Sequence, residues 1–127
     1  IDRARELDLY VFGCADSIVE TQALAQLRPD IINPEPNELI GGGGGVSDQA
    51  YVEANIRAVK DIDENILVEQ AAGVSSPREV YDFIFAGCEA TGAASGIFRA
   101  EDPYQMAEAM IAAVRKAKDD RDAANRL

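Results

Sequence analysis

The chain has 127 residues, of which 47% are hydrophobic, and this is enough for one domain with a modest core. Its formal net charge of −11 repels phosphate backbones and anionic lipids, so we expect neither nucleic acid nor a membrane as a partner. No apolar run approaches the ~20 residues of a membrane-spanning helix, and the first residues lack the apolar core of a signal peptide. We therefore expect partners among small molecules and proteins.

The numbers and positions of cysteine and histidine limit which metal ligands and acid–base residues the chain can offer. Cys14 and Cys88 show no metal-ligand spacing, and the chain contains no histidine. Without a secretory signal, two such cysteines are typical of reduced thiols, so we expect a cytoplasmic protein that holds no metal. The lack of histidine removes the most common acid–base residue and leaves carboxylates as the candidates. Because the sequence opens inside a helical pattern and without methionine, we also expect protein upstream of Ile1.

The predicted elements alternate along the first half of the chain. A short helix at residues 2–7 precedes an apolar run at 9–14 that is typical of a buried strand, and a capping box at 17–20 starts a helix ending near Leu27. A second strand begins at Ile31 and ends at Glu35. After a glycine-rich loop, Ser47 is the expected N-cap of a helix whose apolar face carries Tyr51, Ile56, Val59 and Ile62.

The alternation continues to the C-terminus. Residues 66–68 form a third expected strand, and Ser76-Pro77-Arg78-Glu79 predicts a helix start, because it combines an N-cap, an early proline and a capping glutamate. That helix should end near Gly87. Small residues at 90–94 form a fourth strand, and Asp102 and Pro103 start a long helix. The charged tail, 119–127, is expected to fray.

This order, a leading helix and then four βα units, indicates an α/β fold with a parallel sheet and right-handed crossovers. Strand starts near residues 9, 31, 66 and 90 fit both half of a (β/α)8 barrel and a flavodoxin-like sheet. Every loop with unusual composition follows a strand. The C-terminal ends of the strands are where a barrel places its functional groups, which favours the barrel.

The most distinctive segment follows the second strand. Glu35 stands between Pro34 and Pro36, and a run of five glycines, 41–45, comes just before the next helix. A carboxylate fixed at a strand end, beside a glycine loop, suits a catalytic base under a closing lid. Small residues at 71–75 and 92–96 can point backbone amides at an anion, and the second stretch can open a short extra helix. These two loops predict a phosphate site.

Three motifs carry a family resemblance. Asn-Pro-Glu-Pro-Asn-Glu-Leu-Ile-Gly at 33–41 resembles the Glu-Pro-x-Glu-Leu-Ile-Gly signature of archaeal-type triosephosphate isomerases and their bacterial relatives. Residues 72–75 and 94–96 resemble the two phosphate loops of that family. The resemblance runs from Leu9 to about Val114 and corresponds to strands five to eight, the C-terminal half of the barrel. It implies that residues 1–127 form one half-barrel of (βα)4 type.

The resemblance also implies roles for individual residues. Glu35 would be the base that moves a proton between the two carbons of a small phosphorylated sugar, with no cofactor. The substrate phosphate would be contacted by Ile40, Gly73, Ala94 and Ser95. The lid would be Gly41, Gly42, Gly43, Gly44 and Gly45. Five consecutive glycines replace the threonine and bulkier residues of the family lid, so closure should cost more conformational entropy.

The resemblance covers only part of what the reaction needs. The family's lysine and histidine, which polarise the carbonyl, belong to strands absent here, so this chain alone is expected to be inactive. We expect a missing N-terminal half or self-association to complete the barrel. The alternatives are a non-catalytic phosphate-binding or assembly module, and an isomerase of another sugar phosphate.

Local alternatives also stay open. Glu35 could be a surface carboxylate, and the glycine run a flexible linker. Ser75 or Ser76 is expected to cap a helix and not to bind a ligand, and Glu38 could pair with a basic residue at the lid hinge.

Overall fold

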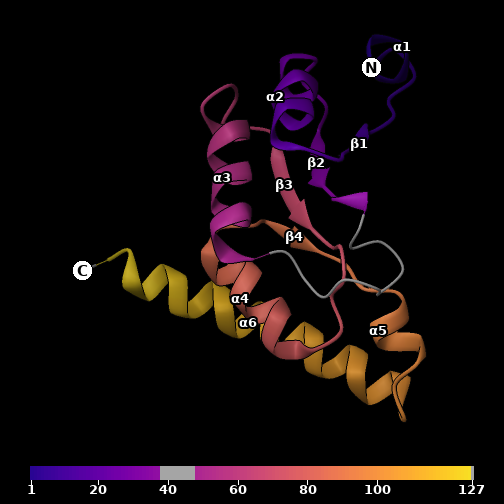
Figure 1. The fold of residues 1–127 in the computed structure, drawn as a ribbon, viewed down its shortest axis with the longest axis vertical. Coiled ribbons are helices and arrows are strands. Elements are labelled where there is room, and N and C mark those ends of the chain that lie inside the picture. The colour runs from indigo at the N-terminus through magenta and orange to yellow at the C-terminus, as the bar shows by residue number, and fades with distance from the viewer. Residues whose placement is uncertain (38–47, 127) are drawn as a thin grey trace.

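The computed structural model describes residues 1–37 and 48–126. Within them, four parallel strands form one sheet in the order β1-β2-β3-β4. The chain order confirms the expected βα alternation after a leading helix (Figure 1). The strands are β1 (Phe12–Ala15), β2 (Ile31–Pro34), β3 (Leu67–Gln70) and β4 (Ala90–Thr91). The helices are α1 (Asp2–Arg5), α2 (Ile18–Gln26), α3 (Gln49–Lys60), α4 (Pro77–Ala86), α5 (Ser95–Phe98) and α6 (Pro103–Ala124).

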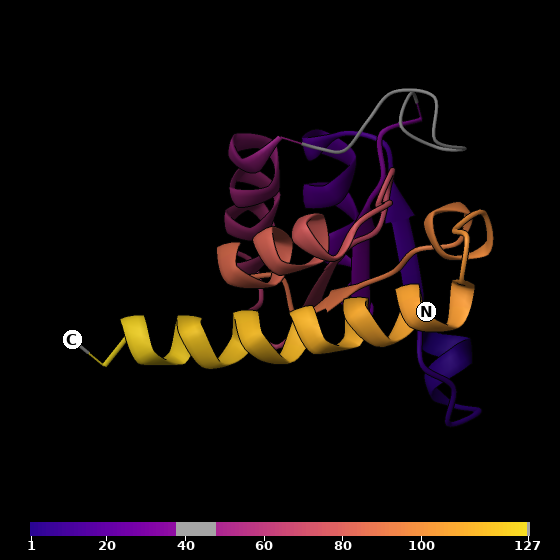
Figure 2. The same ribbon diagram turned by 90° about the horizontal axis from the view of Figure 1, so that it is seen from below.

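One face of the sheet is covered by helices. α2, α3 and α4 lie next to one another along this face, and α6 packs along α4 (Figures 1 and 2). Ile32 and Val68 point into this layer and are buried with Val59 and Ala25. A second apolar cluster joins α4 to α6 through residues that include Phe83, Ile84, Cys88, Met110 and Ala117.

The other face of the sheet has no helix against it among the described residues. Successive strand residues alternate between faces, so Phe12 on β1, Ile31 on β2 and Leu67 on β3 share the uncovered face. The register places these three side by side. Phe12 is 51% exposed and Leu67 42% exposed, which is unusual for apolar strand residues. An apolar sheet face of this kind is what the interior wall of a barrel would present if the opposite wall were removed.

Helix starts follow the sequence signals closely. The Ser17 hydroxyl accepts from the Glu20 amide, and Ser76 forms a complete capping box with Glu79. Asp102 caps α6 by accepting from the amides of Tyr104 and Gln105. The expectation of Ser47 as N-cap of α3 was wrong: the cap is Asp48, which suits the position equally well and adds negative charge at a helix start. Ser47 lies outside the described residues.

Several boundaries differ from the prediction. The first strand begins at Phe12 and not near residue 9, and Leu9 and Tyr10 are exposed. The fourth strand consists of only two residues, Ala90 and Thr91, although residues 90–94 were expected. α6 continues to Ala124, so most of the segment expected to fray is helical, while fraying in solution stays a prediction. No described helix combines the length and apolar content needed to cross a bilayer.

Candidate active site

A cluster of polar side chains lies at the carboxyl ends of β1, β2 and β3. Cys14 is in register with Asn33, and extending the register of Ile31 with Leu67 by two residues places Asn33 level with Glu69. All three therefore belong to one layer on the uncovered face, next to the apolar layer of Phe12 and its neighbours. Glu35 follows one layer further toward the carboxyl ends.

Glu35 is held in place by the backbone. Its amide donates to the Ala15 carbonyl at 2.7 Å, which continues the pairing of β1 with β2 past the last strand residue. Two residues further on, the Asn37 amide donates to a side chain, an Asp16 carboxylate oxygen, at 2.6 Å. Glu35 also lines a cavity of about 410 Å³ together with Cys14, Leu24 and Asn37. Glu35 is partly buried as a residue, and the alternative of a surface carboxylate stays open.

The electrostatics of the cluster are those of crowded acidic groups. Burial raises the pKa of Glu69, and the nearby charge of Glu35 raises it further. The pKa of Cys14 is also raised, first by burial and then by the charge of Glu35, while a hydrogen bond from Asn33 acts in the opposite direction. Glu69 adds a smaller increase to the pKa of Cys14. These couplings show that Glu35, Glu69 and Cys14 lie close enough to influence one another.

Asn33 carries an unusual feature for a residue that is only 4% exposed. Its side-chain oxygen, Oδ1, is buried and has no hydrogen-bond partner among the described residues. Buried polar atoms are generally paired, so an acceptor of this kind costs stability unless water or a ligand satisfies it. Asn33 Oδ1 lies in the same layer as Glu69, at the carboxyl end of the sheet, where the sequence predicts the catalytic and phosphate-binding residues.

The two predicted phosphate loops are in direct contact. A Cβ placed on Gly96 would lie 2.5 Å from the Val74 carbonyl oxygen and 2.6 Å from the Ser75 Cα, so only glycine fits there. Gly73, in the first loop, has a φ of 77°, which glycine adopts without strain. The sequence therefore builds one continuous surface from residues 71–76 and 94–96.

Glu79 fixes the shape of the first loop. Its Oε2 atom accepts from the Ser75 amide at 2.7 Å, the Ser75 hydroxyl at 3.1 Å and the Ser76 amide at 2.8 Å. The amide and hydroxyl of Ser75 are thus used by the fold, and the serine that caps the helix is Ser76. Ala94 is the N-cap of α5, and Ser95 is its first residue.

The predicted site residues divide into three groups. Glu35 lies in the carboxylate cluster, and Gly73, Ala94 and Ser95 belong to the contacting loops. Ile40 and the glycines 41–45 lie outside the described residues. Sequence reasoning missed Glu69 and Asn33, although Glu69 follows an apolar strand run at 66–68 and has the parity of the uncovered face. The described residues contain no group of three or more histidine, cysteine or acidic side chains that could hold a metal.

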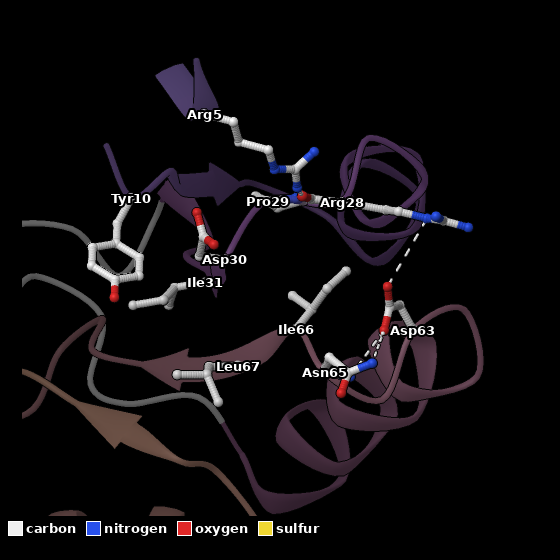
Figure 3. A pocket seen from close by; sticks show the side chains of 10 residues that line it. All are labelled: Arg5, Tyr10, Arg28, Pro29, Asp30, Ile31, Asp63, Asn65, Ile66 and Leu67. Atoms are coloured by element: carbon white, nitrogen blue, oxygen red, sulfur yellow. Dashed lines mark hydrogen bonds and ion pairs between the residues drawn. The ribbon is translucent and has the colours of Figure 1, made fainter. Parts of the chain in front are cut away.

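A larger cavity, of about 790 Å³, lies at the opposite end of the sheet (Figure 3). Its polar side chains form hydrogen bonds with the backbone: Arg5 donates to the Arg28 carbonyl, and an Asp30 carboxylate oxygen accepts from the Val11 amide at 2.6 Å. Arg28 also lies 4.0 Å from Asp63. Conserved chemistry in barrels belongs to the other end of the strands, so this cavity is not the candidate site.

Similarity to known proteins was found at three levels. The family described as "Thiazole biosynthesis protein ThiG" matches residues 10–126. The triosephosphate isomerase of Sulfurisphaera tokodaii is 36% identical over 121 residues, which are 94% of this chain and 52% of that protein. The triosephosphate isomerase of Archaeoglobus fulgidus is 33% identical over 113 residues, 87% of this chain and 51% of that protein. The chain thus spans about half the length of these curated relatives.

Solved structures agree on the architecture. A BexX/CysO complex from Amycolatopsis orientalis matches with a TM-score of 0.70 at 23% identity, covering 96% of this chain and 49% of that one. A structure described as native KDPGal matches with a TM-score of 0.67 at 24% identity, covering 91% of this chain and 52% of that one. The four parallel βα units are therefore one half of a barrel fold.

The comparisons differ in the activity named for the matched proteins and agree on the fold. The family match covers nearly the whole chain, and the uncovered sheet face fits a half-barrel. The chain belongs to the family described as thiazole biosynthesis protein ThiG, a TIM-barrel family.

Proposed function

We propose that this chain supplies the catalytic base and the phosphate-binding loops of a triosephosphate isomerase-type enzyme, which interconverts an aldose phosphate and a ketose phosphate without a cofactor. The observation that carries the proposal is the position of Glu35. It extends from the carboxyl end of β2, half-buried, on the same end of the sheet as the two contacting small-residue loops. Curated relatives over most of this chain are named triosephosphate isomerases, which supports the same reaction.

The proposed roles combine the family resemblance with the places of Glu35, Gly73, Ala94 and Ser95 in the fold. Glu35 removes a proton from one carbon of the substrate and returns it to the neighbouring carbon. The substrate phosphate is bound by backbone amides of Gly73 and Ala94 and by Ser95, and the family resemblance adds Ile40, which lies outside the described residues. The glycines 41–45, which lie outside the described residues, are proposed as the lid on the family resemblance alone, and a lid that excludes water would strengthen electrostatic interactions in the site.

The proposed enzyme needs a second half. The uncovered apolar face of the sheet leaves Phe12 and Leu67 exposed, and the curated relatives are about twice as long as this chain. We propose that an N-terminal half-barrel, or a second copy of the chain, covers this face. An N-terminal half of the family type would also bring the lysine and histidine that the resemblance places there.

The test is reconstitution. The chain is co-expressed with the half of the Sulfurisphaera tokodaii protein that it does not match, and conversion of dihydroxyacetone phosphate is followed in a coupled assay. Activity should appear in the mixture and be lost in Glu35→Gln. Glu64→Gln, in the exposed turn before β3, is the matched control and should keep full activity. An active Glu35→Gln mixture would remove Glu35 from the mechanism.

A thiazole-forming role is the second candidate, because the family match covers residues 10–126. Two bacterial strains separate the possibilities, one requiring thiazole and one lacking triosephosphate isomerase. Rescue of the thiazole-requiring strain alone would favour the second candidate. Binding of a triose phosphate without turnover, in a stable assembly, would instead favour a non-catalytic phosphate-binding module. Turnover of a different sugar phosphate would keep the isomerase and change its substrate.

A further inference from the structure

Exposed apolar side chains gather on the two outermost βα units. The described residues include eleven large apolar side chains that are exposed, and nine of them belong to the first unit, 1–27, or to the last, 90–124. Only Leu67 on β3 and Phe85 on α4 belong to the middle of the fold. The nine are Leu7, Leu9, Tyr10, Phe12, Val19, Leu27, Phe98, Tyr104 and Ile111. Single exposed apolar residues are ordinary on a monomer, but a concentration of this kind indicates a contact surface.

Both of these units lie at an edge of the fold. β1 and β4 are the first and last strands of the sheet, and the outer edge of each is unpaired in the described part of the chain. α2 contacts α3, α3 contacts α4, and α4 contacts α6, so α2 and α6 are the outer helices of the layer (Figures 1 and 2). Unpaired strand edges offer backbone hydrogen bonds to another chain. The two edges are therefore where the fold can continue into a partner.

The exposed faces of the outer helices carry few charges. On α2 the exposed positions hold a single charged side chain, Glu20, which already accepts from the Asp16 amide at 2.8 Å. The first three turns of α6 likewise hold only Glu108 among their exposed residues. Charged residues make up 28% of the whole chain, so these two faces are depleted of charge. Depletion of charge is typical of the centre of a protein–protein interface.

The uncovered face of the sheet connects the two edges. The cavity of about 790 Å³ at its amino end is lined in part by the apolar side chains of Tyr10, Ile31 and Leu67 (Figure 3). Phe12 stands in the same layer as Ile31 and Leu67. Protein interiors are close-packed, so a hollow of this size beside apolar side chains leaves room for the side chains of another chain.

The accessible area agrees with a missing contact. The chain exposes 7768 Å², whereas a compact monomer of 13.6 kDa exposes about 6,600 Å². The excess is about 1,200 Å² for each chain, or about 2,400 Å² for two copies. Permanent dimers bury roughly 2,000–5,000 Å² in total. Contact between two copies would thus hide enough surface for a stable dimer.

We infer that two copies of this chain close on each other as a two-fold symmetric dimer, in which β1 of each copy lies beside β4 of the other. All four strands are parallel, so a two-fold axis along the strand direction keeps every strand parallel and repeats one contact twice. Four strands from each copy give the eight of a closed barrel and leave no free edge. The inference goes beyond the proposed function and does not depend on it, because it concerns the chain without a complementary half.

A second copy fits both edges because each copy supplies the edge that the other needs. An unrelated partner would have to present parallel strands to β1 and to β4 at the same time. Glu35 and Glu69 lie nearer the carboxyl ends than the apolar layer, at the face where a barrel admits its ligands, so closure leaves them hydrated. The term that opposes the dimer is the net charge of −11 on each copy, and salt screens this repulsion.

The test is the oligomeric state of the 127-residue chain, measured by sedimentation equilibrium over a range of concentrations. Wild type should reach twice 13.6 kDa, and Val19→Glu and Ile111→Lys should each raise the dissociation constant of the dimer by about 10²-fold or more, because each places a charge in both contacts. Ala50→Glu, at an exposed position of α3, is the matched control and should dimerise like wild type. A wild-type monomer at every concentration, or a dimer unaffected by both edge substitutions, would overturn the inference.

The two edge variants should keep the fold of the single chain. Val19 is 74% exposed and Ile111 is 70% exposed, so neither side chain belongs to the core. Glutamate suits the first turn of α2, where the helix dipole favours negative charge, and lysine forms helix better than isoleucine inside α6. Amide spectra of each variant check that it is folded.

Mixing the variants separates a two-fold dimer from other kinds of association. In a pair of Val19→Glu with Ile111→Lys, one contact carries both substitutions and the other is wild type. Native mass spectrometry should therefore detect the mixed dimer at concentrations where neither variant dimerises alone, and added salt should strengthen the wild-type dimer. A mixture that stays monomeric, or a wild-type dimer that salt weakens, would contradict the inference. Neither readout uses enzymatic activity, so such a failure leaves the proposed function intact.

Discussion

Gly96 lies so close to Ser75 that the two proposed phosphate loops share one backbone surface. The Ser75 Cα would be 2.6 Å from a Cβ at position 96, and the Val74 carbonyl oxygen would be still nearer. Both neighbours are backbone atoms, which cannot move aside as the end of a flexible side chain can. The contact fixes the second loop against the first.

Gly96→Ala should therefore separate the loops. We expect a loss of about 1–3 kcal/mol in the free energy of unfolding, the usual cost of overpacking, and weaker binding of a triose phosphate. Urea denaturation and calorimetric titration measure the two effects. Ser95→Ala removes a hydroxyl without adding an atom and is the control for stability. Equal stability and affinity in Gly96→Ala and wild type would contradict the contact.

The capping box of α4 gives a prediction about stability. Ser76→Ala removes the acceptor for the Glu79 amide and should lower the free energy of unfolding by about 1 kcal/mol. Glu79→Ala should cost more, because its carboxylate accepts three bonds from Ser75 and Ser76. Asp82→Ala, which loses only an exposed ion pair with Arg78, should change stability by at most about 0.5 kcal/mol. Urea denaturation ranks the three, and any other order would count against this account of the loop.

The two cysteines should differ in reactivity. Burial raises the pKa of Cys88 to about 12, and its side chain is fully enclosed. Cys14 is exposed as a residue, and partial burial of its thiol, followed by the charge of Glu35, raises its pKa. Iodoacetamide should therefore label Cys14 in the folded chain and Cys88 only after unfolding. Because the thiolate is the reactive form, Glu35→Gln should speed labelling of Cys14. Mass spectrometry of the labelled protein checks both expectations.

Glu69 also predicts a pH dependence of stability. Its pKa is raised in the folded state, so between the unfolded and folded pKa values the folded chain binds more protons. Its contribution is complete below the unfolded pKa and is lost as pH rises through the folded pKa. Glu69→Gln should thus stabilise the chain relative to wild type at pH 7 and lose that advantage near pH 4. Thermal unfolding of both proteins at the two pH values measures the difference, and an equal difference at both would argue against a raised pKa.

Much of the fold could be predicted because local signals and long-range packing agree. Ser76, Pro77 and Glu79 specify a helix start through contacts within four residues, and the structure contains the complete capping box. The alternation of apolar runs with such starts predicted the parallel sheet. Strand ends were predicted less well, because pairing decides them: the apolar Leu9 and Tyr10 match a strand pattern, yet the strand begins at Phe12.

The candidate site could be proposed in part for the same reason. Glu35 is marked by its flanking prolines, and the small-residue loops by their composition, so both could be found from local patterns. Glu69 has no such mark. Its significance comes from a register between β2 and β3 and from its proximity to Glu35, which only the folded chain brings about. Asn33 was missed likewise, since its buried, unpaired oxygen depends on neighbouring strands.

The most direct test of the central claim is hydrogen exchange at the substrate carbon. The chain, combined with the unmatched half of the Sulfurisphaera tokodaii protein, is incubated with dihydroxyacetone phosphate in D₂O, and proton NMR follows the hydroxymethyl signal. If Glu35 is the base, deuterium enters this carbon with the wild-type chain and with Glu64→Gln, and not with Glu35→Gln. Exchange that continues unchanged in Glu35→Gln would contradict the account.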